Sequence, residues 1–273
     1  MNRFFQDIKN NFTEKGSCLC VGLDPDISRM PEKFRSSESA LFDFLAPIID
    51  ATADKVCAYK PNMAFFEVAG PPGIEQLIRV IRHIRDVDPG IPILLDAKRG
   101  DIGNTAKKYA ESIFEVLAAD GTTVNPYMGR DTIEPFTEYV DKGVFALCLT
   151  SNPGYIDFEN RVSDGEPIFI HIAKRMAGTN SNKNIGLVVG ATHPSEAEKV
   201  REAAPELPFL MPGIGAQGGD PAAIMKIGTT ESGFPPIVNS SRGILYAGSG
   251  DDFAVVAGEA AAKTRDKLNM FMK

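Results

Sequence analysis

The sequence contains no tryptophan, and among its 273 residues there are three histidines and four cysteines. The histidines, His83, His171 and His193, lie far apart, and none has metal-ligand spacing to another histidine or to a cysteine. We interpret them as structural residues. The sequence therefore predicts no metal site and no Ser-His-Asp arrangement.

The four cysteines lie within apolar, strand-like runs, at positions 18, 20, 57 and 148. Buried reduced thiols are expected in such surroundings, and they are typical of a reducing compartment. Residues 1–16 lack a continuous apolar segment followed by a small-residue cleavage site, so they predict an amphipathic first helix instead of a signal peptide. We therefore expect a cytoplasmic protein.

Long apolar runs and basic runs are also missing. No stretch approaches the roughly 18 apolar residues that a membrane-spanning helix needs. The formal net charge is −7, and it argues against nucleic acid or an anionic membrane as a partner. A small anion bound in a locally positive pocket remains compatible with this charge.

Short runs rich in Val, Ile and Leu recur along the whole chain, and most are followed by a segment with helical spacing. This alternation is typical of repeated βα units with a parallel sheet. We predict eight strands, at 17–24, 55–62, 91–98, 121–127, 143–151, 184–192, 207–215 and 235–243.

Helical spacing fills the intervals between these strands. The main predicted helices cover 39–54, 73–87, 104–119, 166–179, 194–205 and 253–271. Eight strands without a linker or low-complexity tract match an α/β fold of the (β/α)₈ barrel type better than a doubly wound sheet of five or six strands. We expect residues 1–273 to form a single barrel domain.

A barrel predicts that polar chemistry gathers where its strands end, because active sites of this fold lie at the carboxyl-terminal face. Alternate residues of a strand share a face, so Asp96 and Lys98 are expected to point into one mouth and Arg99 elsewhere. The polar or turn residues at the predicted strand ends are Asp24, Lys60, Asp96, Lys98, Asn125, Thr150, Ser151, Pro212 and Arg242.

The segment "DAKRGD" at 96–101 has two interpretations. By itself it fits a solvated loop in which Asp101 caps the next helix. Lys60, however, ends the preceding strand as Lys98 ends this one. A surface lysine that snorkels to solvent explains either residue by itself, but it explains two lysines at the same rim less well. An alternating array of ammonium and carboxylate groups suits proton transfer at carbon, because it stabilises a developing carbanion and supplies a proton.

A glycine-rich turn follows the seventh predicted strand, with Gly213, Gly215 and Gly218 in G-x-G-x-x-G spacing. A dinucleotide-binding domain would need several further parallel strands downstream, but the sequence contains one. In a barrel, the loops after strands seven and eight commonly bind phosphate through backbone amides, and Arg242 would complete such a site. A plain glycine-rich turn is the remaining alternative.

The segment "DAKRGDIGNTA" at 96–106 resembles the D-x-K-x-x-D-I-G-N-T signature of the orotidine 5′-phosphate decarboxylase family, in its D-A-K-R-G-D-I form. Further segments resemble the family in the same order along the chain: "VGLDPD", "YKPN", "LTSNPG", "MPGIG" and "SSRG". The resemblance covers about residues 17–245. It implies conversion of orotidine 5′-monophosphate to UMP and CO₂ without a metal or organic cofactor.

The resemblance also implies catalytic residues. Lys98 would protonate C6 as the carboxylate leaves, Asp96 would lie near that carboxylate, and Lys60 would hold Asp96 and the ribose. Asp101, with Thr105 beside it, would enter the partner's site across the interface of a homodimer.

The same resemblance implies the substrate contacts. Asp24 would bind the ribose, and Ser151 would read the pyrimidine. The phosphate would be bound by the turns that contain Pro212, Gly213, Gly215, Gln217 and Arg242. The turn after the seventh strand is short for this family, and the segment 154–167 has no counterpart in its shorter relatives, so it is either a lid or an inert excursion.

Two other functions fit part of the pattern. One is a sugar-phosphate decarboxylase or aldolase-type synthase of the same barrel superfamily, which shares D-x-K-x-x-D but uses Mg²⁺. The other is a non-catalytic barrel that binds a phosphate ligand. Lys60, the I-G-N-T continuation and Ser151 favour a nucleotide substrate.

Overall fold

The computed structural model of the protein describes residues 1–213 and 219–272. Within these residues, eight parallel strands form one sheet. They are β1 (Leu19–Leu23), β2 (Ala58–Pro61), β3 (Leu94–Arg99), β4 (Gly121–Val124), β5 (Gly143–Leu149), β8 (Ile185–Val189), β9 (Phe209–Pro212) and β10 (Ile237–Ser240). Each of the eight predicted strands is confirmed, and each observed strand is shorter than or as long as its prediction.

The sheet order is β2-β1-β10-β9-β8-β5-β4-β3, so neighbours in sequence are neighbours in space. The two outer strands meet through parallel bridges between Tyr59 and Ile93 and between Asn62 and Asp96. The sheet therefore closes on itself, and the predicted (β/α)₈ barrel is confirmed. The dinucleotide-binding alternative is excluded, because that fold needs an open sheet.

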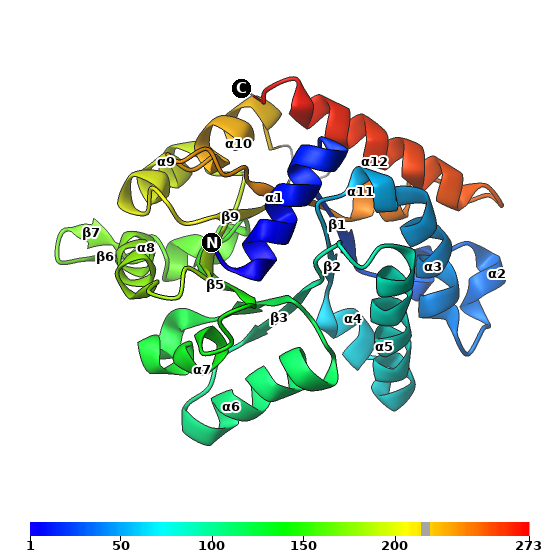
Figure 1. Cartoon of the computed structure of the whole chain (residues 1–273), viewed down its shortest axis with the longest axis horizontal. Coiled ribbons are helices and arrows are strands. Elements are labelled where there is room, and N and C mark those ends of the chain that lie inside the picture. The colour runs from blue at the N-terminus through cyan, green and yellow to red at the C-terminus, as the bar shows by residue number, and fades with distance from the viewer. Residues whose placement is uncertain (214–218, 273) are drawn as a thin grey trace.

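Helices surround the strands (Figure 1). The longer ones are α1 (Arg3–Lys15), α3 (Ala40–Thr52), α5 (Gly70–Val87), α6 (Gly103–Glu111), α8 (Ile168–Thr179), α9 (Pro194–Ala203), α10 (Pro221–Gly228) and α12 (Phe253–Asn269). Short helices are α2 (Glu32–Arg35), α4 (Met63–Glu67), α7 (Glu134–Thr137) and α11 (Arg242–Leu245). The predicted helix 104–119 is α-helical to Glu111 and continues as a wider π-turn over Ser112–Val116.

Helix α1 lies across the amino-terminal end of the barrel, in front of the strands in Figure 1. Its Phe4 and Phe5 are buried against Phe145 of β5. Gly121 and Gly143 begin β4 and β5, and a Cβ atom on either would lie 2.9 or 2.4 Å from the Phe4 ring. Glycine at these two positions therefore lets α1 close this end of the barrel.

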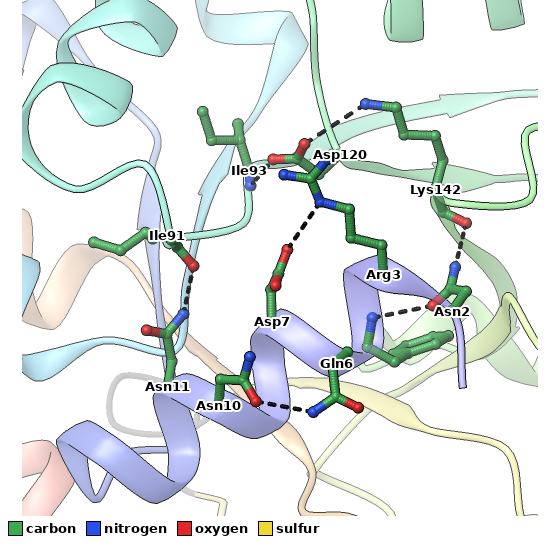
Figure 2. Close-up of polar contacts among 12 residues, drawn as sticks. Asn2, Arg3, Gln6, Asp7, Asn10, Asn11, Ile91, Ile93, Asp120 and Lys142 are labelled. Carbon is green, nitrogen blue, oxygen red and sulfur yellow. Dashed lines mark hydrogen bonds and ion pairs between the residues drawn. The ribbon is translucent and has the colours of Figure 1, made fainter.

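Polar contacts fasten the start of α1 to the barrel (Figure 2). The Asn2 side chain accepts a hydrogen bond from the Phe5 amide at 3.1 Å and donates one to the Lys142 carbonyl at 2.9 Å. Asp120 lies 3.6 Å from the Lys142 ammonium and accepts from the Ile93 amide at 2.9 Å. With the amino-terminal end closed, access to the barrel is from the carboxyl ends of the strands.

The four cysteines are buried free thiols, as predicted. Burial raises the pKa of Cys18 and of Cys20 to about 12, so neither is a reactive thiolate near neutral pH.

Among the described residues, no helix combines the length and apolar character needed to cross a membrane.

Candidate active site

A cavity of about 320 Å³ opens at the carboxyl ends of the strands. It has the size expected of a small-molecule site. Its lining combines charged and amide side chains with a few apolar ones. The lining residues are Asp24, Lys60, Asn62, Asp96, Lys98, Thr123, Leu147, Thr150, Ser151, Asn152, Val188, Leu210, Pro212, Gly213, Asn239, Ser241, Arg242 and Gly243.

Asp96 lies at the centre of the charged part of this cavity. Its Oδ2 accepts a hydrogen bond from Lys60 Nζ at 2.8 Å, and its Oδ1 accepts one from Lys98 Nζ at 2.7 Å. Asp96 and Lys60 are buried, whereas half of the Lys98 side chain is exposed in the cavity. The predicted convergence of the two lysines on one carboxylate is therefore confirmed.

Lys98 reaches the cavity through a local distortion of β3. Its φ angle is +46°, a left-handed conformation that costs energy in a residue other than glycine, and the pairing of β3 with β4 shifts register between Leu95 and Arg99. The Lys98 amide donates to a side chain, Thr123 Oγ1 at 3.0 Å, instead of to a backbone carbonyl of β4. Strict strand alternation therefore predicted the direction of Lys98 correctly without predicting the bulge.

Arg99 points away from the cavity, as predicted. It forms an ion pair with Glu67 at the end of α4 and lies 5.3 Å from the centre of the Tyr109 ring. Of the consecutive basic residues, Lys98 alone therefore lines the cavity.

The charge states follow from this geometry. Burial by itself would raise the pKa of Asp96, but the charges and hydrogen bonds of Lys60 and Lys98 outweigh burial and hold this pKa well below its ordinary value. Burial would lower the pKa of Lys60, but the charges of Asp96 and Asp24 raise it above the ordinary value. The centre of the site is thus a carboxylate bonded to two ammonium groups.

Asp24 follows β1 and borders the same cavity. Tyr246, at the end of α11, accepts a hydrogen bond from the Asp26 amide at 2.6 Å and donates one to the Asp24 carbonyl at 2.9 Å. The tyrosine hydroxyl therefore fixes the backbone around Asp24. Asp24 Oδ1 is buried and has no hydrogen-bond partner among the described residues, so it can accept a donor from a bound molecule.

Asn239, in β10, and Ser241, just after it, lie beside Gly22 of β1 and line the same cavity as Asp24. A Cβ atom on Gly22 would lie 1.9 Å from Ser241 Oγ, so glycine is required where β1 passes this side chain. Asn239 donates to Ser241 Oγ at 3.3 Å, and its own Oδ1 is buried without a partner in the described part of the chain. This region therefore contains two buried acceptor oxygens that have no partner among the described residues.

The predicted anion-binding turns follow β9 and β10, and β9 lies across the closed barrel from β3, which carries Lys98. Pro212 ends β9, and Gly213, which follows it, has a φ angle of +112°, which favours glycine. Arg242 begins α11 and also lines the cavity. Gly215 and Gln217 lie outside the described residues.

Asp101 and Thr105 do not line this cavity. Thr105 is exposed, and the partly exposed Asp101 accepts a hydrogen bond from the adjacent Ile102 amide at 2.8 Å. Ile102 is the N-cap residue of α6, and no side chain caps that helix. The interpretation of Asp101 as a helix cap was therefore wrong.

Sequence reasoning missed polar side chains that line the cavity, above all Thr123 and Asn239, and it missed Glu159, which contacts the lining residue Thr150. Thr123 was detectable as a hydroxyl two residues before Asn125, and therefore on the same face of its strand. Asn239 was detectable in the same way, as a polar residue in an apolar run. Glu159 comes from the segment 154–167 and contacts Thr150, a pairing that no local pattern reveals.

Comparison with known proteins gives matches over nearly the whole chain. Residues 17–255 match the profile of the "Orotidine 5′-phosphate decarboxylase / HUMPS family". An orotidine 5′-phosphate decarboxylase of Azoarcus sp. is 49% identical over 269 residues, 98% of this chain and 99% of that protein. That of Paracidovorax citrulli is also 49% identical, over 97% of this chain and 98% of its own.

Solved structures agree with these matches. The structure of Leishmania donovani OMP decarboxylase superimposes with a TM-score of 0.87 at 38% identity, and the match covers 99% of this chain and 98% of that one. Leishmania donovani UMP synthase gives a TM-score of 0.86 at 40% identity, over 98% of this chain and 57% of the larger protein.

Proposed function

The chain belongs to the orotidine 5′-phosphate decarboxylase family, and on this premise we propose how its residues convert orotidine 5′-monophosphate to UMP and CO₂. The chain is a carboxy-lyase of pyrimidine biosynthesis. One observation supports the mechanism most directly: the ionised Asp96 is bonded to Lys60 and Lys98 inside one cavity.

The reaction breaks the bond between C6 and the substrate carboxylate and leaves its electron pair on C6. Lys98 is the general acid: its ammonium stabilises the C6 carbanion and then transfers a proton to it. The neutral amine regains a proton from solvent, which reaches the exposed half of the Lys98 side chain. Lys60 holds Asp96 in place and, with Asp24, binds the ribose.

Repulsion between Asp96 and the substrate carboxylate contributes less than Lys98 does. Two like charges about 4 Å apart repel by roughly 4 kcal/mol at an effective dielectric constant near 20, which corresponds to about three decades of rate. So difficult a decarboxylation needs a larger lowering of the activation free energy than this repulsion supplies. The remainder comes from stabilisation of the carbanion by Lys98 and from phosphate binding energy that orders the site.

The other lining residues bind the parts of the substrate that do not react. Ser151 contacts the pyrimidine, and Arg242 binds the phosphate with the backbone of Pro212 and Gly213. Gly215 and Gln217 are proposed as phosphate contacts on sequence alone. Asp24 Oδ1, which lacks a partner among the described residues, accepts a hydrogen bond from a ribose hydroxyl.

We further propose a homodimer in which Asp101 and Thr105 complete the partner's site. Two features support this assignment. Neither residue lines the cavity of its own chain, and the loops after β3 and β4 carry large exposed apolar side chains: Ile102, next to Asp101, is 59% exposed and Tyr127 is 82% exposed. Apolar side chains this exposed often mark a protein interface.

The free thiols support a reducing compartment, for which we propose the cytoplasm.

The decisive experiment follows the loss of orotidylate absorbance with the wild type and with Lys98→Ala, each with and without EDTA. The wild type is expected to turn over equally in both conditions. Lys98→Ala is expected to lose at least about a thousandfold in kcat, because it removes both the proton donor and the stabilising charge.

Lys226→Ala is the matched control, since Lys226 is an exposed lysine of α10 that does not line the cavity. It should retain wild-type turnover. Equal rates for Lys98→Ala and the wild type would remove Lys98 from the mechanism. If EDTA abolished turnover by the wild type, the Mg²⁺-dependent alternative would be favoured.

A further inference from the structure

The segment 154–167 is attached to the barrel at both of its ends. It consists of a short helix, Pro153–Asp157, and a two-stranded hairpin of β6 (Val162–Ser163) and β7 (Glu166–Pro167) that leads directly into α8. The Phe169 amide donates to the Glu159 carbonyl at 3.0 Å. The backbone of Glu159 is therefore held by the start of α8.

Both carboxylate oxygens of Glu159 contact one residue, Thr150. The Thr150 amide donates to Oε2 at 2.7 Å, and the Thr150 hydroxyl lies 2.7 Å from both Oε1 and Asn152 Oδ1, so these two acceptors share its one proton. Because β5 ends at Leu149, the Thr150 amide has left the ladder with β8, and Glu159 supplies the acceptor that the ladder no longer offers. An amide left without an acceptor here would be costly.

Ser151, the next residue, is confined from the other side by β8 and the loop that follows it. A Cβ atom on Gly190 would lie 2.9 to 3.0 Å from the backbone and Cβ of Ser151, so the two chains are in close contact. The Ser151 carbonyl accepts a hydrogen bond from Thr192 Oγ1 at 3.4 Å. Small movements of Thr150 must therefore displace Ser151 or the β8 loop.

The same segment contacts that loop directly. The Tyr155 ring lies 4.1 Å from the ring of His193, centre to centre, with the two planes inclined by 31°. The segment thus joins the loops after β5 and β8. This arrangement fits neither an inert excursion nor a lid that swings freely.

From these contacts we infer that Glu159 is a positioning residue, which fixes the end of β5 so that Ser151 meets the pyrimidine in one orientation. Glu159 acts through Thr150 and does not line the cavity. The inference depends on the proposed function, in which Ser151 contacts the substrate base.

The test compares Glu159→Gln, Ser151→Ala and the double variant. Glutamine keeps the size of the side chain but carries no charge: its one carbonyl oxygen can accept from the Thr150 amide while its Nε2 donates to the Thr150 hydroxyl, so both contacts lose their ionised, stronger acceptor. We expect Glu159→Gln to lower kcat/KM for orotidine 5′-monophosphate about tenfold and to weaken UMP binding. In the Ser151→Ala background, the same substitution should change kcat/KM less than about twofold, because both act through Ser151.

Glu166→Gln is the matched control, since it removes the exposed ion pair with Lys174 from the same segment. It should leave kcat/KM and UMP affinity at wild-type values. Thr150→Val gives a second variant that keeps the bond from the Thr150 amide and removes the hydroxyl contacts with Glu159 and Asn152. It should reproduce part of the Glu159→Gln effect, with far-UV circular dichroism unchanged.

The outcomes separate the two hypotheses. Full additivity of Glu159→Gln and Ser151→Ala, or wild-type kcat/KM in Glu159→Gln, would overturn the positioning inference and leave the decarboxylase mechanism intact. Wild-type kinetics and UMP affinity in Ser151→Ala would instead overturn the contact between Ser151 and the base, and the inference with it.

Discussion

Thr123 donates its hydroxyl proton to Asp96 Oδ1 over 2.7 Å, and the same hydroxyl oxygen accepts a hydrogen bond from the Lys98 amide at 3.0 Å. The direction of both bonds is fixed, because an amide can only donate and an ionised carboxylate can only accept. A buried hydroxyl of β4 therefore links the left-handed backbone of Lys98 to the carboxylate that its ammonium contacts.

Thr123→Val tests this link, because valine has nearly the same shape but no hydroxyl. The Lys98 amide and Asp96 Oδ1 would each lose a partner, at a cost of about 1 to 3 kcal/mol. We expect kcat to fall about 10- to 100-fold with little change in KM, since Lys98 is misplaced while the substrate-binding residues are not. Steady-state kinetics would measure both constants.

Thr123→Ser is the matched control, because serine keeps the hydroxyl and loses a methyl group. It should recover most of the wild-type kcat. If Thr123→Val turned over as fast as the wild type, the hydroxyl would have no part in holding Lys98.

The stability of the protein should depend on pH through Asp96. Its pKa is well below the ordinary value in the folded state, so it stays ionised where an unfolded aspartate, with a pKa of about 3.9, takes up a proton. The unfolded state then binds more protons, and the stability contributed by Asp96 is lost as the pH falls below about 5.

Urea unfolding of the wild type and Asp96→Asn between pH 3 and pH 6 checks this expectation. The unfolding free energy of the wild type minus that of Asp96→Asn should increase as the pH rises, by at most about 1.4 kcal/mol per pH unit. The contributions of the other carboxyl groups are common to the two proteins, so they cancel in this difference. A difference that is constant across this range would mean that Asp96 has an ordinary pKa.

Mixed dimers test the proposed sharing of Asp101. Lys98→Ala and Asp101→Asn should each be nearly inactive as homodimers. In a heterodimer of the two variants, one of the two sites combines an intact Lys98 with an intact Asp101 from the other chain. An equal mixture that exchanges freely should therefore recover about a quarter of wild-type activity.

The control is a mixture of Lys98→Ala with Asp96→Asn, two residues that hydrogen-bond within one chain. That mixture should recover nothing, because every site lacks one of the two groups. Absence of recovery in the first mixture, with heterodimers demonstrated by mass, would place Asp101 in the site of its own chain.

The pattern of apolar and polar residues along the chain is enough to predict the barrel and the charged centre of its site. Eight apolar runs alternate with helical spacing, and a parallel sheet built this way places the carboxyl end of every strand at one rim. Asp24, Lys60 and Asp96 lie within or just after the carboxyl-terminal part of their predicted strands, so their meeting follows from periodicity. The buried thiols and the outward direction of Arg99 follow from the same local rules.

How these groups are held depends on contacts that form only in the folded barrel. The left-handed φ angle of Lys98, the contact of Thr123 with Asp96, the packing of Phe4 against Gly143 and the contact of Glu159 with Thr150 each join residues that are distant in sequence or depart from a regular strand. Local patterns report which face a side chain occupies, because that depends on nearest neighbours along the chain. They do not report which side chain lies opposite, because that depends on the closure and register of the whole barrel.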